Sequence, residues 1–376
     1  MSSRELRSKT EGEIAQQPGV WPEVLVAART ARARLGEALS RFEDAHGPAE
    51  VVMTGAGTSA HIAEICARHL MGEGRRPVRA VPSTDIVADP HGTLEAGRPR
   101  VLVSFARSGD SPESLAAVQA TDALGPTLQV AVTCNADGKL AWVLGQHDGA
   151  VVLCLPAETN DVGFAMTSSA TSMLLAASTL FEDPVVDDHD WLLASAAALI
   201  DGADPLGGLD GTRFARVVYV GSGPLAGCAR EAALKLLELT AGRVVATSES
   251  TLGFRHGPMA ILDGNSLAVV LVSSDPTRRR YDLDLAAELE RSPRAPRVVT
   301  LSAENLLSTD RPAPTTPDDA RLAMLMLVSA QLLAVRTSLA LGLTPDQPFP
   351  GGELNRVVPG FALHPVADPS PARTNH

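Results

Sequence analysis

Cysteine and basic residues are both scarce in this chain of 376 residues. The four cysteines, Cys66, Cys134, Cys154 and Cys228, are scattered and form no CxxC pair. Their spacing argues against a disulfide framework and against a zinc site, and free thiols of this kind are typical of buried positions in a reducing compartment. Lysine and arginine number 32 against 44 acidic residues, a net charge of −12. Because a negative chain is unsuited to phosphodiester backbones, we expect no nucleic-acid partner.

Long apolar runs are missing as well. The first residues, MSSRELRSKTEGEIAQQP, are mixed in charge and contain no apolar stretch like that of a signal peptide. The most apolar late segment, 322–343, is interrupted by Gln331 and Arg336, so it is typical of a buried helix and not of a membrane span. We therefore expect a cytoplasmic protein without a membrane partner.

The remaining composition is that of a folded protein, with 45% hydrophobic and 20% charged residues. Apolar positions recur at helical spacing over 21–42, which predicts an N-terminal helix. Short apolar runs then alternate with helical patterns, and a further helix is expected over about 168–181. This alternation predicts an α/β fold with a mainly parallel sheet. The expected strands are 50–54, 77–81, 100–105, 127–133 and 150–155.

The second half of the chain repeats the first. The segment VVMTGAGTSAHIAEICARHL, which starts at Val51, aligns with VVYVGSGPLAGCAREAALKL, which starts 166 residues later at Val217. The run VLVS occurs at 101–104 and again at 270–273. We therefore predict a helical segment over 1–48, two tandem α/β units over 49–190 and 191–345, and a tail over 346–376 that covers a site.

Both glycine turns fit the pattern of a dinucleotide fold, but that fit is weak evidence. A dinucleotide site also needs an acidic residue after the second strand, and RRPVRAV stands there. A small phosphate monoester is the alternative anion. The first unit places five donors at neighbouring strand ends, where ligands of parallel sheets bind. These candidate phosphate ligands are Thr58, Ser59, Arg107, Ser108 and Ser111.

The two segments GAGTS at 55–59 and ARSGDS at 106–111 resemble the SIS (sugar isomerase) family, which binds the phosphate of a sugar phosphate. The first serine of the family's loop is Ala106 here, and Arg107 follows it. The second unit carries SSDPTRRR at the corresponding place, so we expect no second phosphate site there. The resemblance implies two tandem three-layer αβα sandwiches.

Further segments resemble the isomerase half of glucosamine-6-phosphate synthase, and more closely the galactosamine-6-phosphate deaminase/isomerase group, also named tagatose-6-phosphate ketose/aldose isomerases. The similarity spans nearly the whole chain. The segments are TEGEIAQQPGVW, SFARSGDSPES, TNDVGFAMTSS, REAALKLLELTAG, ESTLGFRHGP and GELNRVVPG.

By this resemblance Glu238 is the base that moves a proton between C1 and C2 of the sugar, Lys235 is its neighbouring cation, and His256 opens the ring. The spacing of three residues independently places Lys235 and Glu238 on one helix face. The resemblance also implies that residues 165–169 contact the sugar hydroxyls and that Arg356 stands near the place of the synthase's C-terminal lysine. In the synthase the histidine comes from the partner subunit, which implies at least a homodimer here.

The sequence thus predicts an enzyme that converts a hexosamine 6-phosphate by aldose/ketose isomerisation and releases ammonia, without a metal or cofactor. Galactosamine 6-phosphate, giving tagatose 6-phosphate, is the expected substrate. A glucosamine-6-phosphate deaminase and an isomerase of amine-free sugar phosphates are the enzymatic alternatives. A non-catalytic sugar-phosphate sensor is the rival of another class, although phosphate binding alone needs none of Lys235, Glu238 and His256.

Overall fold

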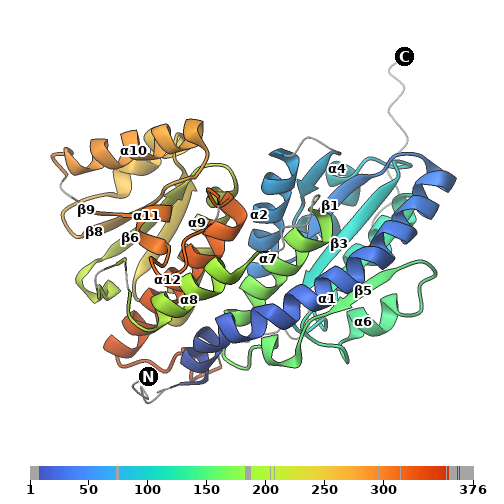
Figure 1. The fold of residues 1–376 in the computed structure, drawn as a ribbon, viewed down its shortest axis with the longest axis horizontal. Helices are drawn as coiled ribbons and strands as arrows, with labels where there is room; N and C mark the ends of the chain where they lie inside the picture. The colour runs from blue at the N-terminus through green and yellow to red at the C-terminus, as the bar shows by residue number, and fades with distance from the viewer. Residues whose placement is uncertain are drawn as a thin grey trace.

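Two parallel sheets form the framework of the molecule (Figure 1). The computed structural model describes residues 8–72, 76–182 and 188–352 apart from 204, 207, 295 and 314, together with 354, 362 and 364. The first sheet has the strand order β2-β1-β3-β4-β5, and the second has the order β7-β6-β8-β9. Every strand pair is parallel, which confirms the predicted α/β class.

The first sheet and its helices form one lobe, which follows the long N-terminal helix α1 (Lys9–His46). The five expected strands are all present, within two residues of their predicted ends. The strands are β1 (Glu50–Thr54), β2 (Val78–Ala80), β3 (Arg100–Ala106), β4 (Thr127–Thr133) and β5 (Val151–Cys154), and the helices are α2 (Thr58–Gly72), α3 (Ser83–Ala88), α4 (Pro90–Thr93), α5 (Pro112–Leu124), α6 (Lys139–Leu144), the 3₁₀ turn η1 (Ala157–Thr159) and α7 (Ser168–Phe181).

The second lobe repeats this plan. Its strands are β6 (Arg216–Gly221), β7 (Val245–Ser250), β8 (Ser266–Leu271) and β9 (Arg297–Leu301), and its helical segments are α8 (Asp190–Ile200), η2 (Gly211–Arg213), α9 (Pro224–Leu239), η3 (Gly253–Arg255), η4 (Pro258–Ile261), α10 (Pro276–Glu290), α11 (Ala303–Leu306) and α12 (Asp319–Ala340). The crossover from β7 to β8 consists of η3 and η4, where the first lobe uses the helices α3 and α4 between β2 and β3.

The strand order of the first sheet changes direction at its centre, between β1 and β3. Helix α2 follows β1 and buries Ile62 and Ile65 on the inner face of the sheet. Helix α5 follows β3 and buries Ala117 and Val118 on the outer face. Because β1 and β3 are neighbours whose helices leave in opposite directions, a crevice opens at their carboxyl ends. Both predicted phosphate segments lie at this crevice.

One continuous hydrophobic core joins the two lobes. It contains the inner faces of both sheets and the helices α1, α2, α7, α8, α9 and α12 between them. Each sheet has a second, smaller core on its outer face. Among the described residues, α12 alone is long and apolar enough to cross a membrane, and 83% of its most apolar window is buried inside the protein. As expected for 322–343, it is a core helix here.

Helices α2 and α9 cross the boundary between the lobes in close contact. The approach is closest at Gly227 of α9, where an added Cβ would lie 2.9 Å from Cγ1 of Ile65 and 3.1 Å from its backbone nitrogen. Thr58 at the start of α2 contacts Lys235 in the last turns of α9, whereas Glu64, further along α2, pairs with the earlier Arg230, so the helices run antiparallel. Glycine at 227 therefore sets the distance between the lobes.

We expect Gly227→Ala to destabilise the protein by about 1–3 kcal/mol, because overpacking must separate the two helices. The urea midpoint measures this loss. Gly36→Ala is the matched control, since Gly36 also lies inside a helix but has nothing within 4 Å of its added Cβ. The control should be neutral or stabilising by up to about 1 kcal/mol. Equal effects of the two substitutions would contradict the close-contact account.

Candidate active site

The side chain of Lys235 lies at the centre of a polar cluster between the two lobes. It is completely buried in the last turns of α9. Its Nζ atom lies 2.5 Å from Oε2 of Glu238 and 3.3 Å from Oε1 of Glu231, and it donates a hydrogen bond of 2.9 Å to Oγ1 of Thr58. The structure thus brings the predicted pair Lys235 and Glu238 together, and it adds Glu231 and the start of α2.

Opposing influences set the protonation of this cluster. Burial alone would lower the pKa of Lys235, but the carboxylates of Glu231 and Glu238 raise it above its ordinary value. Burial raises the pKa of Glu238, and the Glu231 carboxylate raises it further, whereas Lys235 and Arg107 oppose this rise. A carboxyl group whose pKa lies above the usual value is suited to give a proton back after taking one.

The predicted phosphate residues lie at the carboxyl ends of β1 and β3. Thr58 and Ser59 are buried in the first turn of α2. Ser111 occupies the N-cap position of α5, and its side chain does not cap that helix. The loop between β3 and α5 is anchored by a side chain that follows β4, because Asn135 Nδ2 donates to the carbonyl oxygen of Ser108 at 2.9 Å. The loop that carries Ser108 and Ser111 is therefore fixed to the end of the neighbouring strand β4.

Arg107 connects the phosphate loop to the acid–base cluster. Its side chain is buried, with 7% of the residue exposed. Its positive charge opposes the rise that burial causes in the pKa of Glu238 and in the pKa of Asp161. Thr58 makes a second connection, since its single hydroxyl proton is donated to Glu231 at 3.1 Å. The phosphate loop and the cluster thus border the same space.

Asp161 caps the start of α7 within the segment 165–169. Buried Asp161 accepts hydrogen bonds from the backbone N–H groups of Thr167, Ser168 and Ser169 and from the hydroxyl of Ser169 at 2.5 Å. These donors are committed to capping the N-terminus of α7, because a carboxylate there satisfies amides that the helix leaves open. The backbone N–H groups of these three residues are therefore already satisfied by Asp161, whereas the predicted contact of 165–169 with sugar hydroxyls stays a prediction.

The structure does not bring His256 to Glu238 within one chain. His256 is exposed and directly follows η3. Phe254, two residues earlier, is buried in the outer core of the second sheet, whereas α9 packs on the inner face. The segment that carries His256 is therefore anchored on the face of the second sheet opposite to α9. Arg356 and most of the tail lie outside the described residues.

Sequence reasoning missed Glu231 and His61. Glu231 is fully buried, and its Oε2 lies 3.0 Å from Nδ1 of His61. The spacing of Glu231, Lys235 and Glu238 at i, i+4 and i+7 on one helix face was a usable signal for the first of these. No local signal exists for the contact with His61, because the two residues are 170 positions apart.

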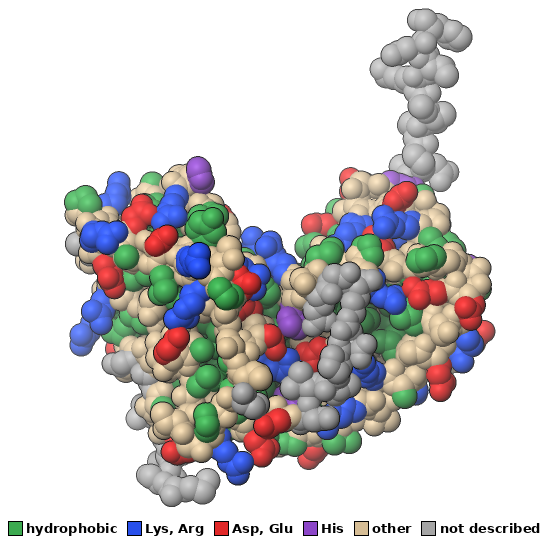
Figure 2. All heavy atoms as spheres, turned by 45° about the horizontal axis from the view of Figure 1, so that its top comes forward, with side chains coloured by type: hydrophobic (Ala, Val, Ile, Leu, Met, Phe, Trp, Pro, Cys, Tyr) green, Lys and Arg blue, Asp and Glu red, His purple; other side chains and the backbone are tan. Residues whose placement is uncertain are grey.

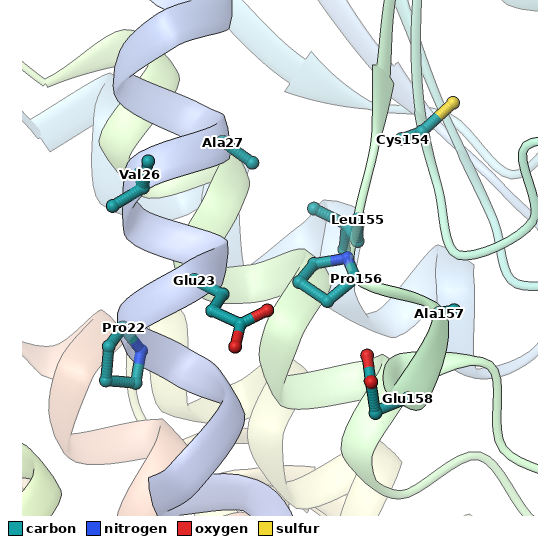
Figure 3. A pocket seen from close by; sticks show the side chains of 9 residues that line it. All are labelled: Pro22, Glu23, Val26, Ala27, Cys154, Leu155, Pro156, Ala157 and Glu158. Atoms are coloured by element: carbon teal, nitrogen blue, oxygen red, sulfur yellow. The ribbon is translucent and has the colours of Figure 1, made fainter.

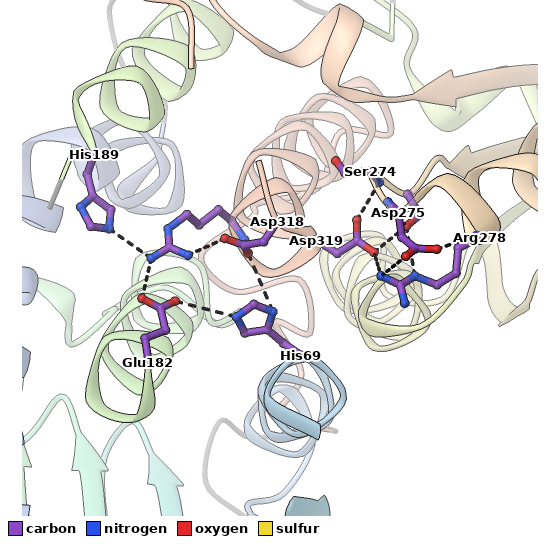
Figure 4. A network of polar contacts seen from close by, with 10 residues as sticks. His69, Glu182, His189, Ser274, Asp275, Arg278, Asp318 and Asp319 are labelled. Atoms are coloured by element: carbon purple, nitrogen blue, oxygen red, sulfur yellow. Dashed lines mark hydrogen bonds and ion pairs between the residues drawn. The ribbon is translucent and has the colours of Figure 1, made fainter. Parts of the chain in front are cut away.

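Two other polar or hollow regions lie away from this cluster. A pocket of about 610 Å³ between α1 and the end of β5 is lined by Pro22, Glu23, Val26, Ala27, Cys154, Leu155, Pro156, Ala157 and Glu158 (Figure 3). At the far end of α2, ligand atoms of His69, Glu182 and Asp318 lie within 4.8 Å of one another. Arg321 contacts Glu182 at 2.7 Å and Asp318 at 2.5 Å, so a guanidinium already supplies the positive charge there (Figure 4).

Comparisons with known proteins agree with this geometry. Residues 47–182 match the SIS domain family. An AgaS protein of Streptomyces coelicolor is 48% identical over 96% of both chains. The chain belongs to the AgaS family of SIS-domain proteins. The D-galactosamine-6-phosphate deaminase AgaS of Escherichia coli is 40% identical over 95% of both chains. The crystal structure of tagatose-6-phosphate ketose/aldose isomerase from Escherichia coli has a TM-score of 0.83 at 37% identity, covering 96% of this chain and 97% of that one.

The cluster predicts a strong and pH-dependent effect of Lys235→Met. The carboxylates of fully buried Glu231 and partly buried Glu238 would then lack their cation, which we expect to destabilise the protein by about 3–5 kcal/mol near neutral pH. Without the lysine, which opposes the rise, the pKa of Glu238 lies still further above its ordinary value in the folded state, so protonation restores stability as the pH falls. Urea unfolding at pH 8 and pH 5 should show a smaller loss at pH 5.

Lys139→Met is the matched control, because Lys139 is exposed at the start of α6. It should change the free energy of unfolding by less than about 0.5 kcal/mol. A Lys235→Met effect that is equally small, or independent of pH, would contradict the buried charge cluster.

Proposed function

We propose that this protein is a D-galactosamine-6-phosphate deaminase that converts its substrate and water into tagatose 6-phosphate and ammonia. The observation that carries the proposal is the buried contact between Lys235 and Glu238 beside the serine loops of the first lobe. Membership of the AgaS family adds the substrate class, because the Escherichia coli relative bears this name. Binding a phosphate would require neither the buried ammonium nor the raised pKa of Glu238.

The reaction follows from what each group can do. Glu238 takes the proton from C2 of the open-chain amino aldose and returns it to C1, while one proton of the amine passes to O1, which leaves a C2 imine beside a C1 hydroxyl. Lys235 stabilises the negative charge that develops on the sugar oxygen and keeps Glu238 ionised before the transfer. Water then adds to the imine, ammonia leaves, and the ketose remains. No oxidant or metal takes part in this balance.

The phosphate end of the substrate binds at the crevice of the first sheet in this proposal. Ser59, Ser108 and Ser111 donate hydroxyls, and Arg107 supplies a positive charge. Thr58 contributes through its backbone, since its hydroxyl proton is donated to Glu231. The Arg107 charge acts on Glu238 as well, so the phosphate end of the sugar lies toward α5 and its C1–C2 end toward α9.

An aldose/ketose isomerase of amine-free sugar phosphates is the second candidate, because the Escherichia coli relative of known structure is named as such an isomerase. The proton transfer at Glu238 is the same in both reactions. The two functions differ only in whether an amine stands at C2. Ammonia release therefore separates them.

The test is ammonia release coupled to ketose-phosphate detection, with galactosamine 6-phosphate and glucosamine 6-phosphate offered separately. We expect ammonia from galactosamine 6-phosphate and a loss of at least about 1000-fold in kcat for Glu238→Gln, because the amide cannot take the proton. Binding of the sugar phosphate, measured by thermal shift, should persist in this variant. Near wild-type turnover would remove Glu238 from the mechanism, and binding without turnover of either sugar would favour a sensor or an isomerase of amine-free sugar phosphates.

We further propose that the active protein is a cytoplasmic homodimer in which His256 of one subunit opens the sugar ring at the cluster of the other. The support is its exposure: His256 is exposed, has no contact with Glu238 of its own chain among the described residues, and follows Phe254, which is buried on the face of the second sheet opposite to α9. An imidazole can move a proton near neutral pH.

Mixed dimers test this arrangement. Two tagged chains, one carrying Glu238→Gln and the other His256→Ala, are co-expressed, and the dimers holding both tags are isolated. If the site is shared, one of two sites is intact, and we expect about half of the wild-type activity from a two-fold symmetric dimer. Each variant alone should be nearly inactive. Mixed dimers as inactive as the parents would place His256 at its own chain's site, and a His256→Ala variant that is fully active alone would remove His256 from the mechanism.

A further inference from the structure

The carboxylate of Glu231 has no step of its own in the proposed proton transfer, yet it is the most enclosed acidic group of the cluster. Its side chain is fully buried. Oε1 accepts a hydrogen bond from Thr58 at 3.1 Å and lies 3.3 Å from the ammonium of Lys235. Oε2 lies 3.0 Å from Nδ1 of His61. Each oxygen therefore has a partner from α2.

The contact with His61 fixes which ring nitrogen carries a proton. An ionised carboxylate has only acceptors, so Nδ1 of His61 must be the donor in this hydrogen bond. The second nitrogen faces a different environment. His61 is 23% exposed at the side chain and lines a cleft of about 800 Å³ between the lobes, where the molecular surface is hollowed (Figure 2). The charged groups that line the same cleft are Glu64, Arg68, Arg79 and Arg230.

The hydrogen bond from His61 affects the position of the Lys235 ammonium between two carboxylates. Its Nζ atom is closer to Glu238, at 2.5 Å, than to Glu231, at 3.3 Å. A buried carboxylate oxygen that has lost its donor is unfavourable, because nothing replaces the water it gave up on burial. If Oε2 of Glu231 lost its donor, rotation of the carboxylate toward Lys235 would recover part of that cost. The ammonium would then be drawn away from Glu238.

We propose that His61 is a positioning residue for the deaminase reaction: its Nδ1–H group holds Glu231 so that Lys235 remains on Glu238. The role rests on the proposed function, since it matters only if Glu238 performs the proton transfer. His61 acts through Glu231 and touches no reacting atom. The expected signature is a loss in kcat with little change in KM, because the phosphate loop is untouched.

Two substitutions separate the hydrogen bond from the bulk of the ring. Asparagine places its side-chain NH₂ where Nδ1 stands, so His61→Asn keeps a donor to Glu231, whereas His61→Leu fills similar space without one. We expect His61→Leu to lower kcat by about 10- to 100-fold with KM within about threefold, since small displacements of a catalytic group have effects of this size. His61→Asn should recover kcat to within about fivefold of the wild type.

Glu64→Gln is the control for the cleft. Glu64 lines the same cleft, but its partners are Arg68 and Arg230, which lie outside the chain of contacts to Lys235. Its kcat should equal that of the wild type. A His61→Leu variant with wild-type kcat, or a His61→Asn variant as impaired as His61→Leu, would overturn the positioning role.

Nitrogen-15 spectra of histidine-labelled wild-type protein, with His61→Asn to assign the signal, test the bond without any activity. We expect His61 to be protonated at Nδ1; a ring protonated at Nε2 alone would overturn the proposal. If the wild type releases no ammonia from either hexosamine 6-phosphate, the proposed function fails and this role with it. If the wild type is active and His61→Leu has the same kcat, only the role of His61 is overturned.

Discussion

A fully buried ammonium group at the boundary between the two lobes is the constraint on which the rest of the structure depends. Lys235 has no exposed surface, and an uncompensated charge in such a place would cost several kcal/mol. The compensation comes from both lobes, because Glu231 and Glu238 lie on α9 whereas Thr58 begins α2. The pairing that makes Glu238 suitable for proton transfer therefore also joins the lobes. The contacts of Lys235 thus serve both the proposed proton transfer and the stability of the fold.

The two lobes have the same plan but differ at the carboxyl ends of their strands. At the carboxyl edge of the second sheet, buried Asp282 accepts hydrogen bonds from Ser222 at 2.6 Å, from Thr251 at 2.5 Å and from the backbone of Ser273 at 3.0 Å. An internal carboxylate thus occupies the strand ends that correspond to the proposed phosphate site of the first sheet. This arrangement supports the expectation that only the first unit binds a sugar phosphate.

Local pattern was enough to predict most of the framework. Apolar runs bounded by glycine turns gave the strands of the first sheet, and the repeat from Val51 to Val217 gave its second copy. Helical spacing alone placed Lys235 and Glu238 on one face. The contacts between α2 and α9 could not be predicted in the same way, because they join residues about 170 positions apart and depend on packing at Gly227. The capping role of Asp161 was missed because serines and threonines in a motif are equally suited to bind a ligand or to face a carboxylate.

The most direct test of the account is a crystal structure of the protein with 2-amino-2-deoxygalactitol 6-phosphate, an open-chain analogue that cannot isomerise. The account predicts that the phosphate lies on Ser59, Ser108 and Ser111, with the C1–C2 bond within about 4 Å of the Glu238 carboxylate, the reach needed for proton transfer. A phosphate bound at the second sheet, or a C1–C2 bond that Glu238 cannot reach, would contradict it.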